Sequence, residues 1–193
     1  MGTATEDEPA GPGTRPGGLA SLPFKAIGDQ PGFEPGDIEP FVAAERIAIL
    51  AYVRLDGRPG QVPIWYVHRD GALFLSTDTG SAKHRALERD PRVCVTIQDE
   101  RPPYRAIIFD AVAQIRPMTD GSPTAGIERR YFGRIGGKEY QKLTAEHRAD
   151  TALVEVELRP TALRGFDNTH LVGRPITAFL RARPKLPLLR RWL

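Results

Sequence analysis

Residues 74–83 read FLSTDTGSAK, and this stretch decides how the rest of the chain is interpreted. Its first half is typical of a strand, a glycine then marks a turn, and a helix begins just before Lys83. Helix amino termini present unpaired N–H groups and a partial positive charge, so a lysine there is unfavourable unless an anion binds beside it. Ser76, Thr77 and Ser81 carry hydroxyl groups that can donate to the same anion. The stretch predicts a phosphate site, with a hydroxyl-capped helix and an exposed lysine as the alternative.

The residues before this stretch predict antiparallel strands. Runs at 46–54, 60–68 and 72–77 are rich in strand-forming residues, and Asp56-Gly57 and Asp70-Gly71 separate them. Connections this short leave no room for a parallel crossover. We therefore expect the three runs to form an antiparallel meander.

The residues after Lys83 continue the pattern of strands with small helices between them. The expected elements are a helix at 79–90, strands at 92–98 and 104–116, helices between 122 and 147, and a last strand at 151–158. A short helix at 37–46 precedes the first strand and is expected to plug one end of the sheet. Six antiparallel strands have to hide their edges, so the sequence predicts a mainly β fold that closes, or nearly closes, into a barrel.

The two ends of the chain differ in composition from its middle. Residues 1–33 are rich in Gly and Pro and weakly hydrophobic, which predicts a disordered lead-in. Residues 34–170 form the expected barrel domain, and residues 171–193 form a basic tail rich in Pro and Leu. A tail of this kind allows a weak contact with a membrane surface.

Composition narrows the functional classes. The chain has 193 residues and sets 27 Lys and Arg against 24 Asp and Glu, so no nucleic-acid partner is expected. The single cysteine, Cys94, cannot form an intramolecular disulfide, and no export signal or run of roughly 18 apolar residues is present. We expect a cytoplasmic protein. The four histidines lack metal-binding spacing, so no metal site is expected.

A proline interrupts the second run of strand-forming residues. That run contains Gln61, Val62, Pro63, Ile64 and Trp65. Proline removes a hydrogen-bond donor from the sheet, so the strand needs a free edge or a bulge there, and its exposed backbone can meet a planar heterocycle. Trp65 and Tyr66 point to opposite faces of an ideal strand, and we expect Trp65 to pack in the core.

Residues 101–105 read Arg-Pro-Pro-Tyr-Arg and place two guanidinium groups around a rigid corner. Arginine binds anionic groups through several donors at once, so these side chains can reach a ligand or a partner subunit. A solvated loop is the alternative, because arginine is common on protein surfaces.

These features together resemble the pyridoxamine 5'-phosphate oxidase-like split barrels. The resemblance covers about residues 40–160 and rests on the Asp-Gly hairpins, the Ser-Thr-x-x-Gly-Ser-x-Lys pattern at 76–83 and the Asp-Pro-Arg-Val that follows the helix at residues 90–93. The residues at 101–105 are most similar to the deazaflavin-dependent reductases of that superfamily. The resemblance implies a six-stranded antiparallel split β-barrel with short flanking helices, which works as a homodimer.

The resemblance also implies a cofactor, either deazaflavin (coenzyme F-420) or FMN. It places Ser76 and Thr77 along the cofactor, Lys83 at its phosphate and residues 61–66 beside its ring. Arg105 falls where members of the superfamily reach across the dimer interface to the same cofactor.

The implied activity is a hydride transfer between the cofactor and a small unsaturated organic substrate. A non-catalytic flavin- or haem-binding protein is the alternative, since the fold hosts both kinds. Oxidation of pyridoxamine phosphate is less favoured, because Ala82 stands where those oxidases carry a basic residue before the phosphate-binding lysine. No catalytic acid or base can be assigned.

Overall fold

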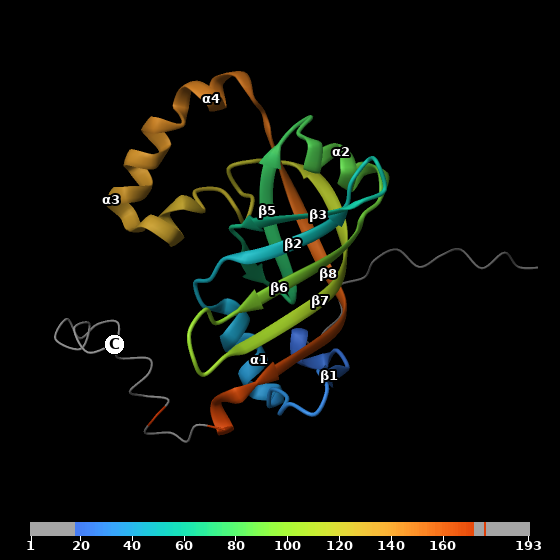
Figure 1. Ribbon diagram of the computed structural model, residues 1–193. Helices are drawn as coiled ribbons and strands as arrows, with labels where there is room; N and C mark the ends of the chain where they lie inside the picture. Colours follow the sequence, from blue (N-terminus) through green and yellow to red (C-terminus); the bar gives the residue numbers. More distant parts are fainter. Residues whose placement is uncertain (1–17, 172–175, 177–193) are drawn as a thin grey trace, which may run out of the picture.

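The computed structural model describes residues 18–171 and residue 176, and its centre is one mainly antiparallel sheet (Figure 1). Its strands are β1 (Phe24–Ala26), β2 (Ala48–Val53), β3 (Pro59–Ile64), β4 (Val67–Arg69), β5 (Ala72–Asp78), β6 (Arg92–Gln98), β7 (Arg105–Pro117) and β8 (Leu153–Asp167). Its helices are α1 (Pro35–Ala43), α2 (Ala82–Arg89), α3 (Glu128–Leu143) and α4 (Ala145–Asp150), with 3-10 turns at Leu19–Ser21 and Asn168–Leu171. The mainly β prediction is confirmed.

The strand order corrects two details of the prediction. The sheet has eight strands in the order β3-β2-β6-β7-β8-β5-β4, with β1 parallel to β8. β3 pairs with β2 and β4 pairs with β5, so the expected meander of consecutive strands is wrong. The chain leaves the sheet at Trp65 and Tyr66, and this break sends the two hairpins to opposite ends of the strand order. In the described part of the chain, no hydrogen-bonded pairing of β3 with β4 closes the predicted six-stranded barrel.

Both predicted Asp-Gly turns are confirmed as hairpin turns. Asp70 and Gly71 have φ values of 51° and 70°, the left-handed pair that a two-residue hairpin requires. Gly57 has a φ of 81° in the turn between β2 and β3. These left-handed residues set the register of the two hairpins that border the site described below.

The last strand is longer than the sequence indicated. Pro160 was expected to lie beyond the final strand, but β8 continues to Asp167 and pairs with β7, β5 and β1. A register shift between Asp110 and Ala111 leaves Thr161 as an extra residue opposite β7, and the Thr161 hydroxyl donates to the Asp110 carbonyl at 3.0 Å. Such a bulge accommodates a proline within a strand.

The beginning of the described chain is part of the core. Leu19 is 0 % exposed and Phe33 6 % exposed, and the Phe33 ring lies 4.9 Å from the ring of Phe41 in α1. The disordered lead-in predicted for residues 1–33 is therefore wrong for residues 18–33, because these apolar side chains bury themselves against α1. Residues 1–17 and most of the predicted tail, residues 172–175 and 177–193, lie outside the described residues.

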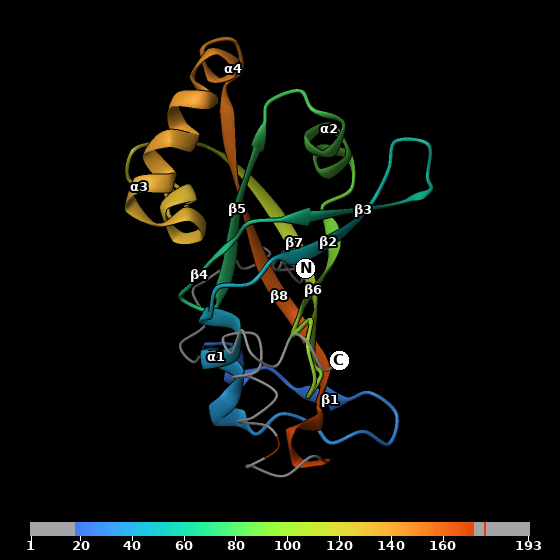
Figure 2. The same cartoon turned by 60° about the vertical axis from the view of Figure 1, so that its left-hand side comes forward.

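α3 and α4 form an arm on one side of the sheet (Figures 1 and 2). α3 bends at Gly133, whose φ of 69° is strained for any other residue. A Cβ atom at Gly137 would lie 3.1 Å from the Arg129 Cα atom, so the missing side chain lets the two halves of α3 approach closely. No helix in the described part of the chain is long and apolar enough to cross a membrane.

Candidate cofactor site

A cavity of about 570 Å³ lies where the end of β5, the start of α2, β3 and α3 meet. Its wall consists of Ile47, Pro63, Ile64, Trp65, Ser76, Thr77, Asp78, Lys83, Ile127, Tyr140, Thr144 and Leu153. Six residues predicted from the sequence therefore surround one space, namely Pro63, Ile64, Trp65, Ser76, Thr77 and Lys83.

The turn into α2 explains the position of its hydroxyl groups. Ser81 is the N-cap of α2, and its Oγ accepts the backbone N–H of His84 at 3.1 Å. The same Oγ lies 3.2 Å from Oγ1 of Thr77, which is 7 % exposed. The capped-helix interpretation is thus correct for Ser81, whose hydroxyl is engaged beside the cavity and is not part of its wall.

Lys83 supplies the positive charge of the wall. It occupies the first turn of α2 and is half-buried. Burial lowers the pKa of its ammonium group, and the neighbouring Asp78 carboxylate opposes this effect only in part. Burial therefore destabilises the charged form of Lys83 by more than Asp78 stabilises it. A bound anion would offset this remaining cost.

β3 forms the wall opposite α2. Within the described residues it pairs with β2 alone, so its other edge is free there, as Pro63 predicted. Pro63 and Ile64 line the cavity at the end of the strand. Gln61 and Val62 do not, because Gln61 faces solvent and Val62 packs against the core.

Four aromatic rings connect this wall to α3. Trp65 is stacked on Tyr131, with ring centroids 5.0 Å apart and planes 13° from parallel. The rings of Phe132 and Tyr140 each lie 5.3 Å from the Trp65 ring. Aromatic pairs at such separations stabilise their arrangement beyond simple burial. The cluster therefore holds α3 against β3 and places Tyr140 in the cavity wall.

Tyr66, and not Trp65, is the core residue of this pair. It is 1 % exposed, and its hydroxyl donates to the Val42 carbonyl at 2.7 Å. Burial raises the pKa of the Tyr66 hydroxyl, so it stays protonated as a donor. The expectation that Trp65 lies in the core is wrong, because β3 ends at Ile64 and the alternation of an ideal strand does not extend to the next two residues.

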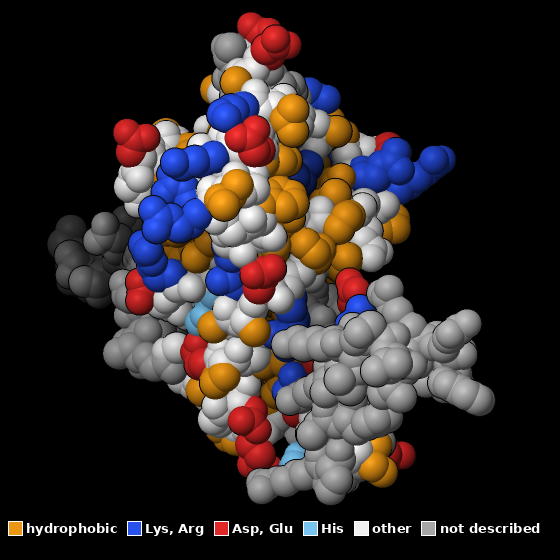
Figure 3. Space-filling model, turned by 90° about the vertical axis from the view of Figure 1, so that its left-hand side faces the viewer, with side chains coloured by type: hydrophobic (Ala, Val, Ile, Leu, Met, Phe, Trp, Pro, Cys, Tyr) orange, Lys and Arg blue, Asp and Glu red, His pale blue; other side chains and the backbone are white. Residues whose placement is uncertain are grey.

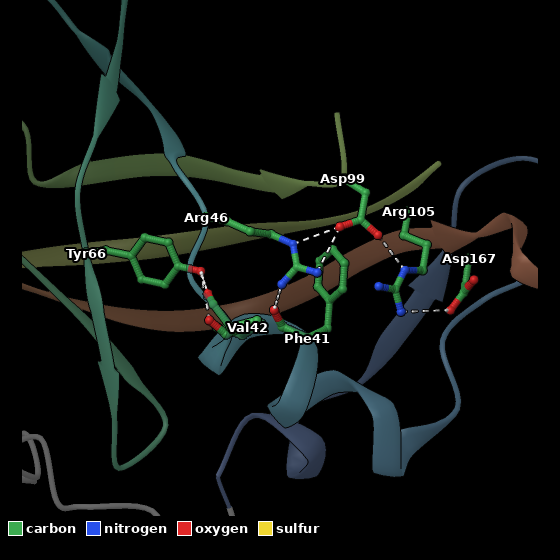
Figure 4. Close-up of polar contacts among 8 residues, drawn as sticks. Phe41, Val42, Arg46, Tyr66, Asp99, Arg105 and Asp167 are labelled. Carbon is green, nitrogen blue, oxygen red and sulfur yellow. Dashed lines mark hydrogen bonds and ion pairs between the residues drawn. The ribbon is translucent and has the colours of Figure 1, made fainter. Parts of the chain in front are cut away.

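Arg105 does not line the first cavity but a second one of about 840 Å³, where Pro63 is the other predicted residue in the wall. Its Nε donates to Asp99 at 2.7 Å, and the other carboxylate oxygen of Asp99 accepts from Nε of Arg46 at 2.9 Å (Figure 4). Both guanidinium groups lie over the Phe41 ring, at 4.7 Å and 4.1 Å. This network fixes Arg105 within its own chain. The two cavities share Ile47 and Pro63 in their walls.

The sequence interpretation missed the contribution of α3. Ile127, Tyr140 and Thr144 line the first cavity although none was predicted there. The signal that could have indicated them is the presence of aromatic residues at 131, 132 and 140 in an otherwise polar, Gly-rich segment. Such rings require a partner surface when a helix is this hydrophilic.

Comparisons with known proteins agree with this architecture. A family model described as pyridoxamine 5'-phosphate oxidase matches residues 35–166. The conserved hypothetical protein Rv2991 from Mycobacterium tuberculosis is 26 % identical, with a TM-score of 0.59 over 78 % of this chain and 94 % of that chain. An F-420 reductase is 25 % identical, with a TM-score of 0.53 over 65 % of this chain and 94 % of that chain. None of the curated proteins matches the chain. Since the matched residues make up well over half of its length, the chain belongs to the pyridoxamine 5'-phosphate oxidase family.

Proposed function

We propose that this protein is a flavin- or deazaflavin-dependent oxidoreductase that acts on a small unsaturated organic substrate. The observation that carries the proposal is the cavity of about 570 Å³, whose wall combines a half-buried lysine, hydroxyl side chains and Asp78 with a larger set of apolar and aromatic side chains. A pocket that is mostly apolar with a few convergent polar groups is the usual form of a small-molecule site.

The residues present fit a cofactor that combines a phosphate with a flat ring. Lys83, Thr77 and Ser76 would hold the phosphate, because they offer one cation and two neutral donors. Pro63 and Trp65 would border the ring, since both line the cavity beside the free edge of β3 and offer it apolar contacts. When bound, a reduced cofactor of this kind supplies hydride to the substrate.

The protein's own contribution is to bind, to orient and to exclude water. Ile47, Ile127 and Leu153 give the cavity an apolar lining that lowers its water content. Asp78 stands in the same wall as Lys83 and restricts how much negative charge the phosphate end accepts. Tyr140 brings a hydroxyl group into the wall, where it can hydrogen-bond a substrate.

Deazaflavin is the preferred cofactor of this proposal. Its support is the similarity to the F-420 reductase at 25 % identity. FMN is the second candidate, because the family model is that of a pyridoxamine 5'-phosphate oxidase.

We also propose that the active unit is a homodimer. The free edge of β3 at Pro63 and the two-arginine corner at 101–105 are the surfaces that support it. The Arg105 Nε already donates to Asp99 of its own chain. Arg105 could therefore bind a partner's cofactor only through its other guanidinium N–H groups. Light scattering at micromolar concentration tests the dimer directly.

The function is tested by titrating the full chain with coenzyme F-420 and with FMN while tryptophan fluorescence is followed. Binding of at least one is expected to quench the emission of Trp65, which lines the cavity. The protein is then mixed with the reduced cofactor and a panel of conjugated carbonyl and nitro compounds, and cofactor oxidation is measured by absorbance. Oxidation that depends on one compound supports the enzyme. Tight binding without oxidation favours the carrier alternative, and the absence of binding by either cofactor contradicts both.

A further inference from the structure

α3 exposes large apolar side chains to solvent. Ile135 is 83 % exposed, Leu143 82 % and Phe132 48 %. Ile135 and Leu143 are eight residues apart, so they lie on the same side of the helix. Phe132 also belongs to the aromatic cluster that attaches α3 to β3, whereas Ile135 and Leu143 are not part of that cluster.

A row of cations runs beside these apolar side chains. Arg134, Lys138 and Lys142 repeat every four residues, so they form one line along α3, next to the line that begins at Ile135. Lys142 is paired with Glu139 at 2.7 Å. Arg134 and Lys138 are exposed, and neither forms an ion pair with another side chain that the structure describes.

Figure 3 views the molecule from the side of this arm. Apolar side chains are visible there next to a group of Lys and Arg side chains. An exposed Arg129 adds a further cation at the beginning of α3. The surface therefore combines apolar side chains with four exposed cations, and one of these, Lys142, is paired with Glu139, which lies on the line between Ile135 and Leu143.

We propose that this face of α3 docks on an anionic membrane surface. Amphipathic helices of this composition lie in the interface plane, with apolar side chains at the headgroup boundary and Lys and Arg near the lipid phosphates. Self-association through the same face would bring two cationic rows together, which is unfavourable. A nucleic acid would neutralise the cations but would leave Ile135 and Leu143 without an apolar partner. The inference is independent of the proposed redox activity.

The test uses the full chain and two kinds of vesicle, phosphatidylcholine alone and phosphatidylcholine mixed with phosphatidylglycerol. Co-sedimentation with the mixed vesicles is expected, together with release by salt, since the charge component is screened. Ile135→Ser combined with Leu143→Ser is expected to lower the partition coefficient by about tenfold or more, because each buried CH₂ contributes to insertion. Arg134→Gln and Lys138→Gln are expected to lower it by about fivefold each, with the mixed vesicles only.

The matched control is Leu55→Ser. Leu55 is 48 % exposed in the turn between β2 and β3, and an arginine beside it, Arg54, is paired with Asp56 at 3.0 Å. This variant should bind as the wild type does. The tail is present in every variant, so its contribution stays constant across the comparison.

Two results would overturn the proposal. If the Ile135→Ser, Leu143→Ser variant binds the mixed vesicles as strongly as the Leu55→Ser control, α3 is not the docking surface. If the wild type binds neither kind of vesicle, α3 does not dock on a membrane. If the Ile135→Ser, Leu143→Ser variant then also has a different molar mass from the wild type in light scattering, the face joins copies of the chain. Circular dichroism of each variant verifies that the fold is retained.

Discussion

Replacing Lys83 with methionine tests the site through two effects of opposite sign. The change keeps the length of the side chain and removes its charge. A hydrogen bond to a charged group contributes about 1.5–3 kcal/mol. Because Lys83 is half-buried and Asp78 already faces it, we expect the lower half of that range for a bound phosphate, which corresponds to roughly 10- to 40-fold weaker cofactor binding.

The same substitution should stabilise the cofactor-free protein. The folded-state pKa of Lys83 lies below its ordinary value of 10.5, since burial disfavours the charged form. The unfolded chain therefore holds this proton more tightly, and the resulting destabilisation is fully present below the folded-state pKa and disappears above 10.5. Lys83→Met should accordingly raise Tm at neutral pH, and the difference in Tm should shrink as the pH rises toward 10.5.

The measurements are a fluorescence titration with each cofactor and thermal unfolding of the cofactor-free protein. Lys25→Met is the control, because Lys25 is an exposed lysine on β1 and its replacement changes the net charge equally. Unchanged cofactor affinity in Lys83→Met would refute the phosphate site. A lower Tm would refute the inference that the buried charge of Lys83 destabilises the cofactor-free protein.

Two further substitutions and one pH titration test the structure that supports the site. Asp99→Asn removes the charge that Arg46 and Arg105 share at 2.8 Å and 2.7 Å, so the free energy of unfolding in urea should fall by about 1–3 kcal/mol. Gly133→Ala places a side chain at a φ of 69° and a ψ of −177°, a conformation that glycine alone adopts readily, which should cost about 1–3 kcal/mol and increase hydrogen exchange in α3. The pKa of Asp90 is lowered to about 2 by hydrogen bonds from the arginine two residues later. Its contribution to stability should be complete above pH 3.8 and lost as the pH falls through about 2, and carboxyl NMR during an acid titration measures that midpoint directly.

Features that depend on neighbouring residues were predictable from the sequence. The Asp-Gly turns, the free edge at Pro63 and the hydroxyl-to-lysine turn before α2 each follow from the chemistry of a few adjacent residues. These local rules were sufficient to bring Ser76, Thr77 and Lys83 to one wall.

Features that depend on residues far apart in the chain were not predictable from the sequence. The stacking of Trp65 on Tyr131 joins positions 66 residues apart (131 − 65), and no periodicity in either segment indicates the pairing. The capture of Arg105 by Asp99 depends on how the corner at 101–105 folds back. Strand β8 extends past Pro160 because Thr161 bulges opposite Asp110 of β7, and this pairing joins residues that lie far apart in the sequence.

The position of β8 has a consequence for how the chain acquires its fold. Among the residues that the structure describes, β8 is the last strand to be synthesised, yet it lies between β7 and β5 and holds the two hairpin halves of the sheet together. A nascent chain can form the early hairpins from local contacts, but their assembly has to wait until the ribosome has released residues 153–167. Until then the inner edges of β5 and β7 are unpaired, and this interval is when the chain most needs protection from aggregation.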